Sequence, residues 1–378
     1  MLIGSGGRDL AVMSHMFRRL SLSIATALVA AVALSAQEGA HQPAAAPQHH
    51  LSKQARLAAI RRAQVWQATD IPTMDLKAGP QGNGAFQPNE TVTCDWVDKK
   101  MTGNTPKFTC AITKDDEVKV KYGADNGEVY GEVAATRLLW ALGFGADRMY
   151  PVRVVCRGCS PDPFKDHKEH RDQVVFDPAA IERKMHGHTL ETKEDEGWAW
   201  PELDLVDEAA GGAPSAHRDA LKLLAVLIQH TDNKAQQQRL ICLSDVKEGE
   251  ECQQPFMMLN DLGLTFGHAN IFNRNSVGSV NFDQWAHAKV WADAKTCIGS
   301  MSQSQTGTLG NPSISEGGRK FLGNLLVQLS DAQLHDLFDV SRFPARATSV
   351  GAKHGLTVDE WVDLFKRKRD EVVNRTCP

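Results

Sequence analysis

The feature that most constrains the fold is a pair of acidic turns, each placed where a buried apolar segment ends. Asp232 follows the apolar run 220–228, whose three- and four-residue spacing predicts a buried helix. Asp261 follows the short apolar run 256–259, which is typical of a strand, and a Gly-containing turn comes next. A second short apolar run, 239–243, lies between them. The predicted order is therefore helix, acidic loop, strand, turn, strand and acidic turn.

This order is typical of a phosphoryl-transfer site. In kinases a loop Asp accepts the proton of the substrate hydroxyl, a polar residue five positions later binds metal, and an Asp before Gly binds metal against the phosphates. Those positions fall on Asp232, Gln237 and Asp261. The residue types depart from the usual pattern, because Gln replaces Asn and Leu262 replaces Phe. The alternative is a pair of ordinary surface turns.

A strand and a helix upstream of both turns supply a matching Lys and Glu. Strict alternation over 117–122 predicts a strand that carries Lys119 and Lys121 on one face. The run 129–143 has apolar residues at helical spacing and ends in Gly, which predicts a helix. A strand Lys paired with a helix Glu orients ATP phosphates in kinases, and Lys121 and Glu132 occupy those positions. The alternative is a solvated strand face beside an ordinary helix acid.

Together these segments resemble the atypical kinases of the secretory pathway, the Golgi casein kinase family, and more distantly the HipA-type kinases. The matching segments are Lys121, Gly131–Ala135 with Leu142–Phe144, Asp232, and Asp261–Gly267. The last of these, with the pattern D-x-G-x-x-F-G, is the most specific. The resemblance covers residues 119–267 and implies an α+β, bilobed protein-kinase-like fold, with a β-rich N-lobe and an α-rich C-lobe.

The resemblance also implies ATP as the nucleotide and a role for the upstream residues. Lys121 is expected to contact the nucleotide phosphates, with Lys119 beside it on the same face, and Glu132 is expected to orient Lys121. Lys121 and Glu132 therefore belong to the expected catalytic set.

The two acidic turns complete the expected site. Asp232 is the third expected catalytic residue and accepts a hydroxyl proton, while Asp261 and Gln237 hold Mg or Mn. Neutral Gln is a poorer ligand than a carboxylate, which leaves a non-catalytic nucleotide- or protein-binding module as an alternative. A disulfide-stapled exported scaffold, in which Lys121 and Glu132 are an incidental pair, is another. The acceptor class, whether protein, sugar or lipid, is not defined by the sequence.

The N-terminal segment predicts export. Basic residues within 16–20 precede a short apolar run and small residues near Ala36, so 1–36 is predicted to be a signal peptide. An uncleaved anchor is the alternative. Residues 37–50, mostly Ala, Pro, Gln and His, predict a disordered linker. The mature protein is then periplasmic or secreted and has no transmembrane span.

The remaining chain divides into a predicted N-lobe, 51–200, and a C-lobe, 201–378. Trp198 and Trp200 mark the crossing, where they could stack on a base or pack in a core. The formal net charge of −4 gives no reason to expect a nucleic-acid partner. Further helices are predicted over 51–67, from Asp177, over 281–294, 319–329, 330–338 and 357–373.

Eight cysteines, all after the predicted cleavage site, predict a disulfide-stabilised protein. Alternating runs at 91–96 and 107–112 predict a hairpin that brings Cys94 beside Cys110. Nearness in sequence favours Cys242 with Cys252 and leaves Cys156–Cys159 and Cys297–Cys377, although spacing does not fix connectivity.

Two of these cysteines permit a different interpretation. Cys156 and Cys159, followed by His167 and His170, contain the ligand types of a tetrahedral zinc site. The gaps are shorter than in zinc fingers, and export favours oxidised cysteines. The disulfide is therefore the preferred prediction.

Overall fold

The computed structural model describes residues 50–245, 251–268, 278–301, 304 and 306–378. The predicted signal peptide, and the predicted linker apart from His50, lie outside these ranges. Within them, no helix is both long enough and apolar enough to cross a membrane.

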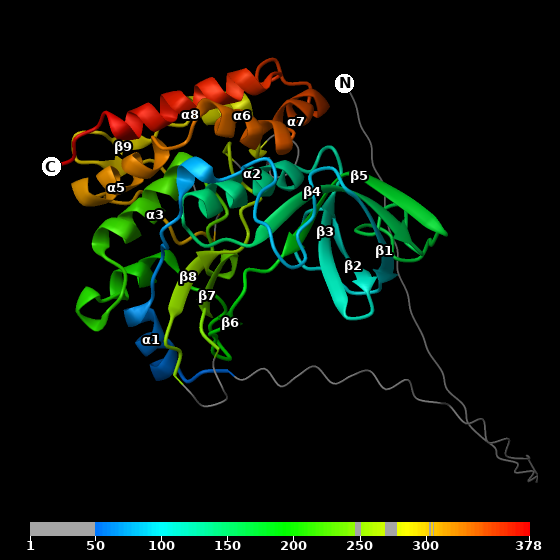
Figure 1. The fold of residues 1–378 in the computed structure, drawn as a ribbon, viewed down its shortest axis with the longest axis horizontal. Helices are drawn as coiled ribbons and strands as arrows, with labels where there is room; N and C mark the ends of the chain where they lie inside the picture. The colour runs from blue at the N-terminus through cyan, green and yellow to red at the C-terminus, as the bar shows by residue number, and fades with distance from the viewer. Residues whose placement is uncertain (1–49, 246–250, 269–277, 302–303, 305) are drawn as a thin grey trace, which may run out of the picture. The chain divides into compact units, whose positions relative to one another are not determined.

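The first half of the described chain builds a closed five-stranded barrel (Figure 1). Its strands are β1 (Thr91–Val97), β2 (Lys107–Thr113), β3 (Asp116–Tyr122), β4 (Arg148–Arg157) and β5 (Gln173–Arg183). The order is β1-β2-β3-β5-β4, and β4 closes the barrel by pairing with β1 in parallel. Closure leaves no barrel strand with an unpaired edge. The predicted hairpin and the strand at 117–122 are confirmed, while closure was not predicted.

Alternating side chains explain why these strands curl around a core. Along β1, Val92 and Cys94 are buried while Thr91, Thr93 and Asp95 are exposed, as expected for a strand with one face inside. Phe108 of β2 packs within 4.8 Å of Phe176 of β5, measured between ring centroids. The barrel therefore has its own apolar interior, to which the Cys94–Cys110 disulfide belongs.

Helix α2 (Glu128–Ala141) lies between the barrel and the helices of the C-terminal half (Figure 1). Every residue of α2 except Trp140 is buried. A helix covered on all faces needs apolar or paired side chains all round. Its one buried arginine, Arg137, donates through Nη1 to the Met149 carbonyl of β4 at 2.5 Å. The helix predicted over 129–143 is thus confirmed, and its burial fixes the position of its acidic residues.

A small sheet and a set of helices follow. The sheet contains β6 (His188–Thr189), β7 (Gln238–Cys242) and β8 (Pro255–Leu259) in that order. The larger helices are α3 (Ser215–Leu227), α5 (Glu316–Leu326), α6 (Asp331–Val340), α7 (Phe343–Ser349) and α8 (Val358–Val373). The remaining elements are α1 (Lys53–Arg62), α4 (Phe282–His287), β9 (Trp291–Asp293) and β10 (Ile298–Gly299). The mixture of α and β structure is as predicted; the two-lobe division at residue 200 stays a prediction.

Three predicted helices were wrong in type or length. The helix predicted from Asp177 is part of β5, because pairing with β3 on one side and β4 on the other outweighs a local Asp-Pro-Ala pattern. The helix predicted over 281–294 is only α4, followed by β9. The helix predicted over 51–67 ends at Arg62, after which Gln64 pairs with Phe256 in an isolated bridge.

All four predicted disulfides are confirmed. They join Cys94 to Cys110, Cys156 to Cys159, Cys242 to Cys252, and Cys297 to Cys377. The last closes the longest loop, with a sequence separation of 80, and ties the C-terminus to the segment before β10. The cysteines of the chain are therefore all oxidised.

Candidate functional site

Lys121 is the centre of a buried charge cluster. Its side chain is fully buried, and Nζ lies 2.7 Å from Glu128, 2.9 Å from Glu132 and 3.5 Å from Asp261. The Lys comes from β3, the two Glu from α2, and the Asp from the turn after β8. The structure thus brings together the strand Lys, the helix Glu and the acidic turn that the sequence singled out.

Glu128 is a member of this cluster that the sequence analysis missed. It precedes Glu132 by four residues, so both project from the same face of α2. Thr105, in the loop between β1 and β2, donates to the Glu128 carboxylate at 3.0 Å. The i to i+4 spacing of two Glu on one helix is the pattern from which the second carboxylate could have been found.

Two glycines allow the acidic turn to approach α2 closely. A Cβ atom on Gly131 would lie 2.9 Å from the Gly263 carbonyl oxygen, and one on Gly263 would lie 2.4 Å from Cγ of Glu128. Both distances are too short for any larger residue. The glycine of the D-x-G pattern and the glycine beside Glu132 therefore set the distance between Asp261 and the helix.

Burial and neighbouring charges shift the pKa values of the carboxyl groups in this cluster in opposite directions. Burial alone would raise the pKa of Asp261, but Lys121 and Lys119 outweigh burial and hold it well below its usual range. Burial dominates at Glu132, where it raises the pKa well above its usual range despite Lys121. Burial also opposes the charge of Lys121, yet the surrounding carboxylates, Asp261 first, raise its pKa. The cluster therefore favours an ionised Asp261 beside the lysines, whereas burial favours the protonated form of Glu132.

Asp232 lies in a second, more open cluster. About a fifth of its side chain is exposed, at 19%. Lys234 and Gln237 each donate to one carboxylate oxygen at 2.8 Å, and Ser304 donates to the other at 3.0 Å. Burial would raise the pKa of this carboxyl, but the hydrogen bonds and the Lys234 charge lower it overall. Asp232 is thus held ionised and fixed in direction.

The loop that carries Asp232 and the turn that carries Asp261 are bonded to each other. The Gln237 carbonyl accepts from the backbone N–H groups of Asn260, at 2.9 Å, and Asp261, at 3.3 Å. Thr231 donates from its backbone N–H and its hydroxyl to the Leu264 carbonyl, both at 3.1 Å. The two acidic segments therefore lie side by side, as the predicted order of elements requires.

Metal ligation can draw on oxygens next to Asp261. The Asn260 side-chain oxygen is buried and accepts no hydrogen bond within the described ranges, which makes it a ligand candidate that the sequence analysis missed. Gln237, the predicted metal residue, directs its amide nitrogen to Asp232. Hard cations such as Mg take carboxylate and amide oxygens. The donor types around Asp261 therefore fit such an ion.

Two further lysines lie on the same side of the sheet as Lys121. Lys119 forms an ion pair with buried Glu182 of β5. Lys107 of β2 is the register partner of Lys121, and among the described residues it forms no hydrogen bond or ion pair through its side chain. Burial, then the neighbouring Lys121 charge, lowers the pKa of Lys107. Lys107 was not predicted, because strand register cannot be read from sequence spacing.

The other predicted contacts have structural roles. Trp198 and Trp200 are buried and pack edge to face at 5.2 Å, so they belong to the core. Cys156 and Cys159 are joined to each other, and His170 bonds the Gly158 carbonyl at 2.7 Å. The four residues of the zinc alternative therefore do not present two thiolates to one ion.

Sequence comparison finds no family model and no curated protein that matches the chain. Among solved structures, the chain is similar to the crystal structure of the Helicobacter pylori proinflammatory kinase CtkA, with a TM-score of 0.41 and 9% sequence identity. The match covers 76% of this chain and 95% of that chain. A likeness at this level establishes neither a family nor a function, so the functional conclusion depends on the site itself.

Proposed function

We propose that the protein is an exported kinase-like phosphotransferase that moves the γ-phosphate of ATP to a hydroxyl acceptor with Mg or Mn. One observation carries the proposal: Lys121 contacts both Glu132, at 2.9 Å, and Asp261, at 3.5 Å. A lysine, the glutamate that orients it and a metal-binding aspartate are the groups that phosphoryl transfer needs together. Four disulfides favour an oxidising location, periplasmic or secreted.

The nucleotide phosphates would bind at Lys121. A phosphate competes with the carboxylates for Nζ, while Glu132, fixed in buried helix α2, keeps the lysine in place. Lys119 and Lys107 add positive charge on the same face of the sheet. Such a site works by positioning and by neutralising charge, and it needs no covalent intermediate.

The metal would be held by oxygens beside the acidic turn. Asp261 is the main ligand, and the Asn260 side-chain oxygen, which lacks a hydrogen-bond donor within the described ranges, fits a second position. Gln237 can offer its amide oxygen, since its nitrogen is already bonded to Asp232. Bound Mg or Mn neutralises charge on the transferring phosphate.

Asp232 would accept the proton of the acceptor hydroxyl. Its lowered pKa keeps it ionised near neutral pH, and Lys234 and Ser304 fix the direction of its oxygens. Because phosphoryl transfer proceeds through a loose transition state, orientation of the hydroxyl matters more than a strong base.

A second candidate is a nucleotide-binding protein that does not transfer phosphate. The observation in its favour is that Asp232 already accepts from three donors, Lys234, Gln237 and Ser304. A hydroxyl acceptor must displace one of them, and Gln237 occupies the position where kinases usually have the metal ligand Asn. In this alternative the Lys121 cluster binds nucleotide and the Asp232 cluster is structural.

Thermal unfolding with ATP, with and without Mn, tests the proposal. A ligand that binds only the folded state stabilises it by about 2.7 kcal/mol at a hundred times its Kd. We expect a Mn-dependent rise in Tm that is lost in Asp261→Ala and kept in Asp115→Ala, whose side chain is 81% exposed. If no metal produces a rise in Tm, the phosphotransferase is no longer the favoured function, and an exported scaffold remains. Binding without phosphate transfer would favour the second candidate.

A further inference from the structure

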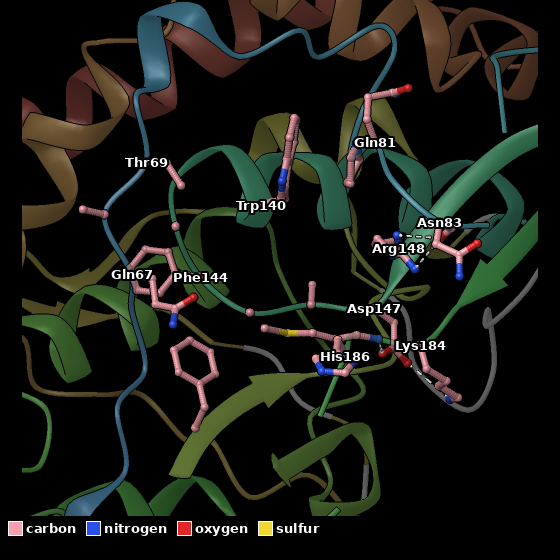
Figure 2. A pocket seen from close by; sticks show the side chains of 17 residues that line it. Gln67, Thr69, Gln81, Asn83, Trp140, Phe144, Asp147, Arg148, Lys184 and His186 are labelled. Carbon is pink, nitrogen blue, oxygen red and sulfur yellow. Dashed lines mark hydrogen bonds and ion pairs between the residues drawn. The ribbon is translucent and has the colours of Figure 1, made fainter. Parts of the chain in front are cut away.

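A pocket of about 650 Å³ lies where the exit of α2 meets the segments 67–69 and 80–83 and the residues after β5 (Figure 2). Neither the Lys121 cluster nor Asp232 lines it. Small-molecule sites commonly measure about 300–1,000 Å³. The pocket is therefore large enough for an organic ligand and is separate from the residues of the proposed phosphoryl-transfer site.

The walls of the pocket combine aromatic and basic side chains. Phe144 and Phe256 are buried and supply an apolar surface, and the partly exposed Trp140 also lines the pocket. Arg148 and Lys184 lie on the other side; in Figure 2, Phe144 is on the left and these two basic residues are on the right. A ligand that spans the pocket meets planar apolar groups at one end and positive charge at the other.

The basic side chains of the pocket wall are only partly neutralised by carboxylates. Arg148 pairs with no carboxylate among the described residues, and it donates to the Asn83 carbonyl at the long distances of 3.4 and 3.5 Å. The Trp140 indole N–H likewise has no acceptor within the described ranges. The one carboxylate of the wall, Asp147, already accepts from the Met185 N–H at 2.8 Å and pairs with Lys184 at 3.2 Å. The pocket therefore favours a ligand with an anionic group.

We propose that this pocket binds a small molecule that joins a planar aromatic ring to a carboxylate or phosphate, and that such a ligand weakens nucleotide binding. The ring would pack against Phe144 and Phe256, and the anionic group would pair with Arg148 and Lys184. The proposal that the pocket binds this ligand does not depend on the proposed function, whereas the effect on nucleotide binding rests on it.

Lys184 connects the pocket to the nucleotide site. It is 58% exposed, and Nζ lies 2.6 Å from buried Glu182, which also pairs with Lys119. An anion in the pocket draws Lys184 away from Glu182. Glu182 then interacts more strongly with Lys119, which lies on the same face of β3 as Lys121 and becomes less available to phosphate. The two ligands should therefore oppose each other, and this opposition must be reciprocal.

Calorimetric titration of the full oxidised chain tests the binding step. The probes are naphthoate, which has ring and charge, naphthylmethanol, which has the ring alone, and acetate, which has the charge alone. We expect naphthoate to bind at least tenfold tighter than either, and Arg148→Met to weaken it at least fivefold. Lys114→Met, which removes a cation that is 90% exposed, is the matched control and should change nothing. Equal binding of naphthoate and naphthylmethanol, or full affinity in a folded Arg148→Met, would overturn the assignment.

The coupling is tested by measuring ATP affinity in Mn with and without saturating naphthoate. We expect naphthoate to weaken ATP binding at least threefold in the wild-type chain and to have no effect on it in Lys184→Gln. Unchanged ATP affinity with naphthoate bound would refute the coupling. If the wild-type chain binds no ATP at all, the proposed function fails instead. The naphthoate titration still tests whether the pocket binds its proposed ligand.

Discussion

The Lys121 and Asp232 clusters contain the same kinds of groups in opposite surroundings. Lys121 is fully buried and has three carboxylates around it, Glu128, Glu132 and Asp261. Asp232 is a partly exposed carboxylate with three donors around it, and only one of them, Lys234, carries a charge. The first cluster is a charged centre inside the protein, and the second is a carboxylate fixed at its surface.

This difference decides what each cluster contributes to stability and to chemistry. Ions taken out of water need close partners, and removal of one partner leaves the others uncompensated. A surface ion pair is screened by water and salt, so its loss changes little. The Lys121 cluster is thus part of the fold as well as of the site. The Asp232 cluster is partly open to solvent, which suits the proton-accepting role proposed for Asp232.

The largest expected effect is on stability. Lys121→Met leaves two buried carboxylates of α2 without their cation, and we expect a loss of about 3–5 kcal/mol in the free energy of unfolding. Lys234→Met, the matched change in the open cluster, should cost no more than about 1 kcal/mol. Urea unfolding of both variants measures this contrast. Similar losses in the two proteins would contradict the distinction between the clusters.

His230 provides a pH-dependent comparison, because it interacts with both clusters. Burial lowers its pKa to about 4 from 6.5, although the charges of Asp232 and Asp261 oppose that change. Between these values the unfolded chain binds a proton that the folded chain does not, so stability falls as the pH falls. The loss reaches about 3 kcal/mol near pH 4 and is absent above pH 6.5.

Urea midpoints of the wild-type chain and His230→Phe, taken across this pH range, isolate the effect. The variant should lose less stability on acidification than the wild-type chain. His335→Gln, which replaces a histidine that is 53% exposed, serves as the control and should keep the wild-type pH dependence. Parallel curves for His230→Phe and the wild-type chain would show that His230 is not buried in its neutral form.

Sequence patterns predicted the parts of the site that depend on local order. Alternation located β3 and its lysines, helical spacing located α2 and Glu132, and the apolar runs located both acidic turns. These features are local, because each is set by residues within one element or one turn. Nearness in sequence gave the Cys94–Cys110 and Cys242–Cys252 disulfides, and the other two pairs followed as the remainder.

Features set by pairing between distant segments were not predicted. Closure of the barrel needs the parallel register of Cys94 with Cys156, which no spacing reveals. The placement of Lys107 opposite Lys121 also follows from register. The Asp-Pro start at Asp177 favoured a helix, but two neighbouring strands determine the conformation there. Elements set by local sequence were therefore easier to predict than the pairing between distant segments.

The catalytic role of the open cluster is tested by Asp232→Asn. This change keeps the shape of the side chain and removes its ability to accept a proton, so we expect phosphate transfer from ATP to fall at least a hundredfold, about 2.7 kcal/mol. ATP affinity should stay within about threefold of the wild-type value. Asp261→Ala should instead lose affinity and turnover together. Full turnover in Asp232→Asn would leave the Lys121 cluster as a nucleotide site and assign Asp232 a structural role.

The smallest expected effect concerns Lys107, which lies on the same face of the sheet as Lys119 and Lys121. Of these three lysines, it is the one whose side chain has no hydrogen-bond or ion-pair partner among the described residues. Burial and the nearby Lys121 lower its pKa, so its charge destabilises the empty protein, and a bound phosphate would compensate that charge. Lys107→Met should therefore raise the Tm without ligand while weakening ATP binding about tenfold, about 1.4 kcal/mol. Lys99→Met, in the loop after β1 and 62% exposed, is the matched control and should change neither. A lower Tm with unchanged ATP affinity in Lys107→Met would mean that Lys107 supports the barrel and that phosphate binding depends on Lys121 and Lys119 alone.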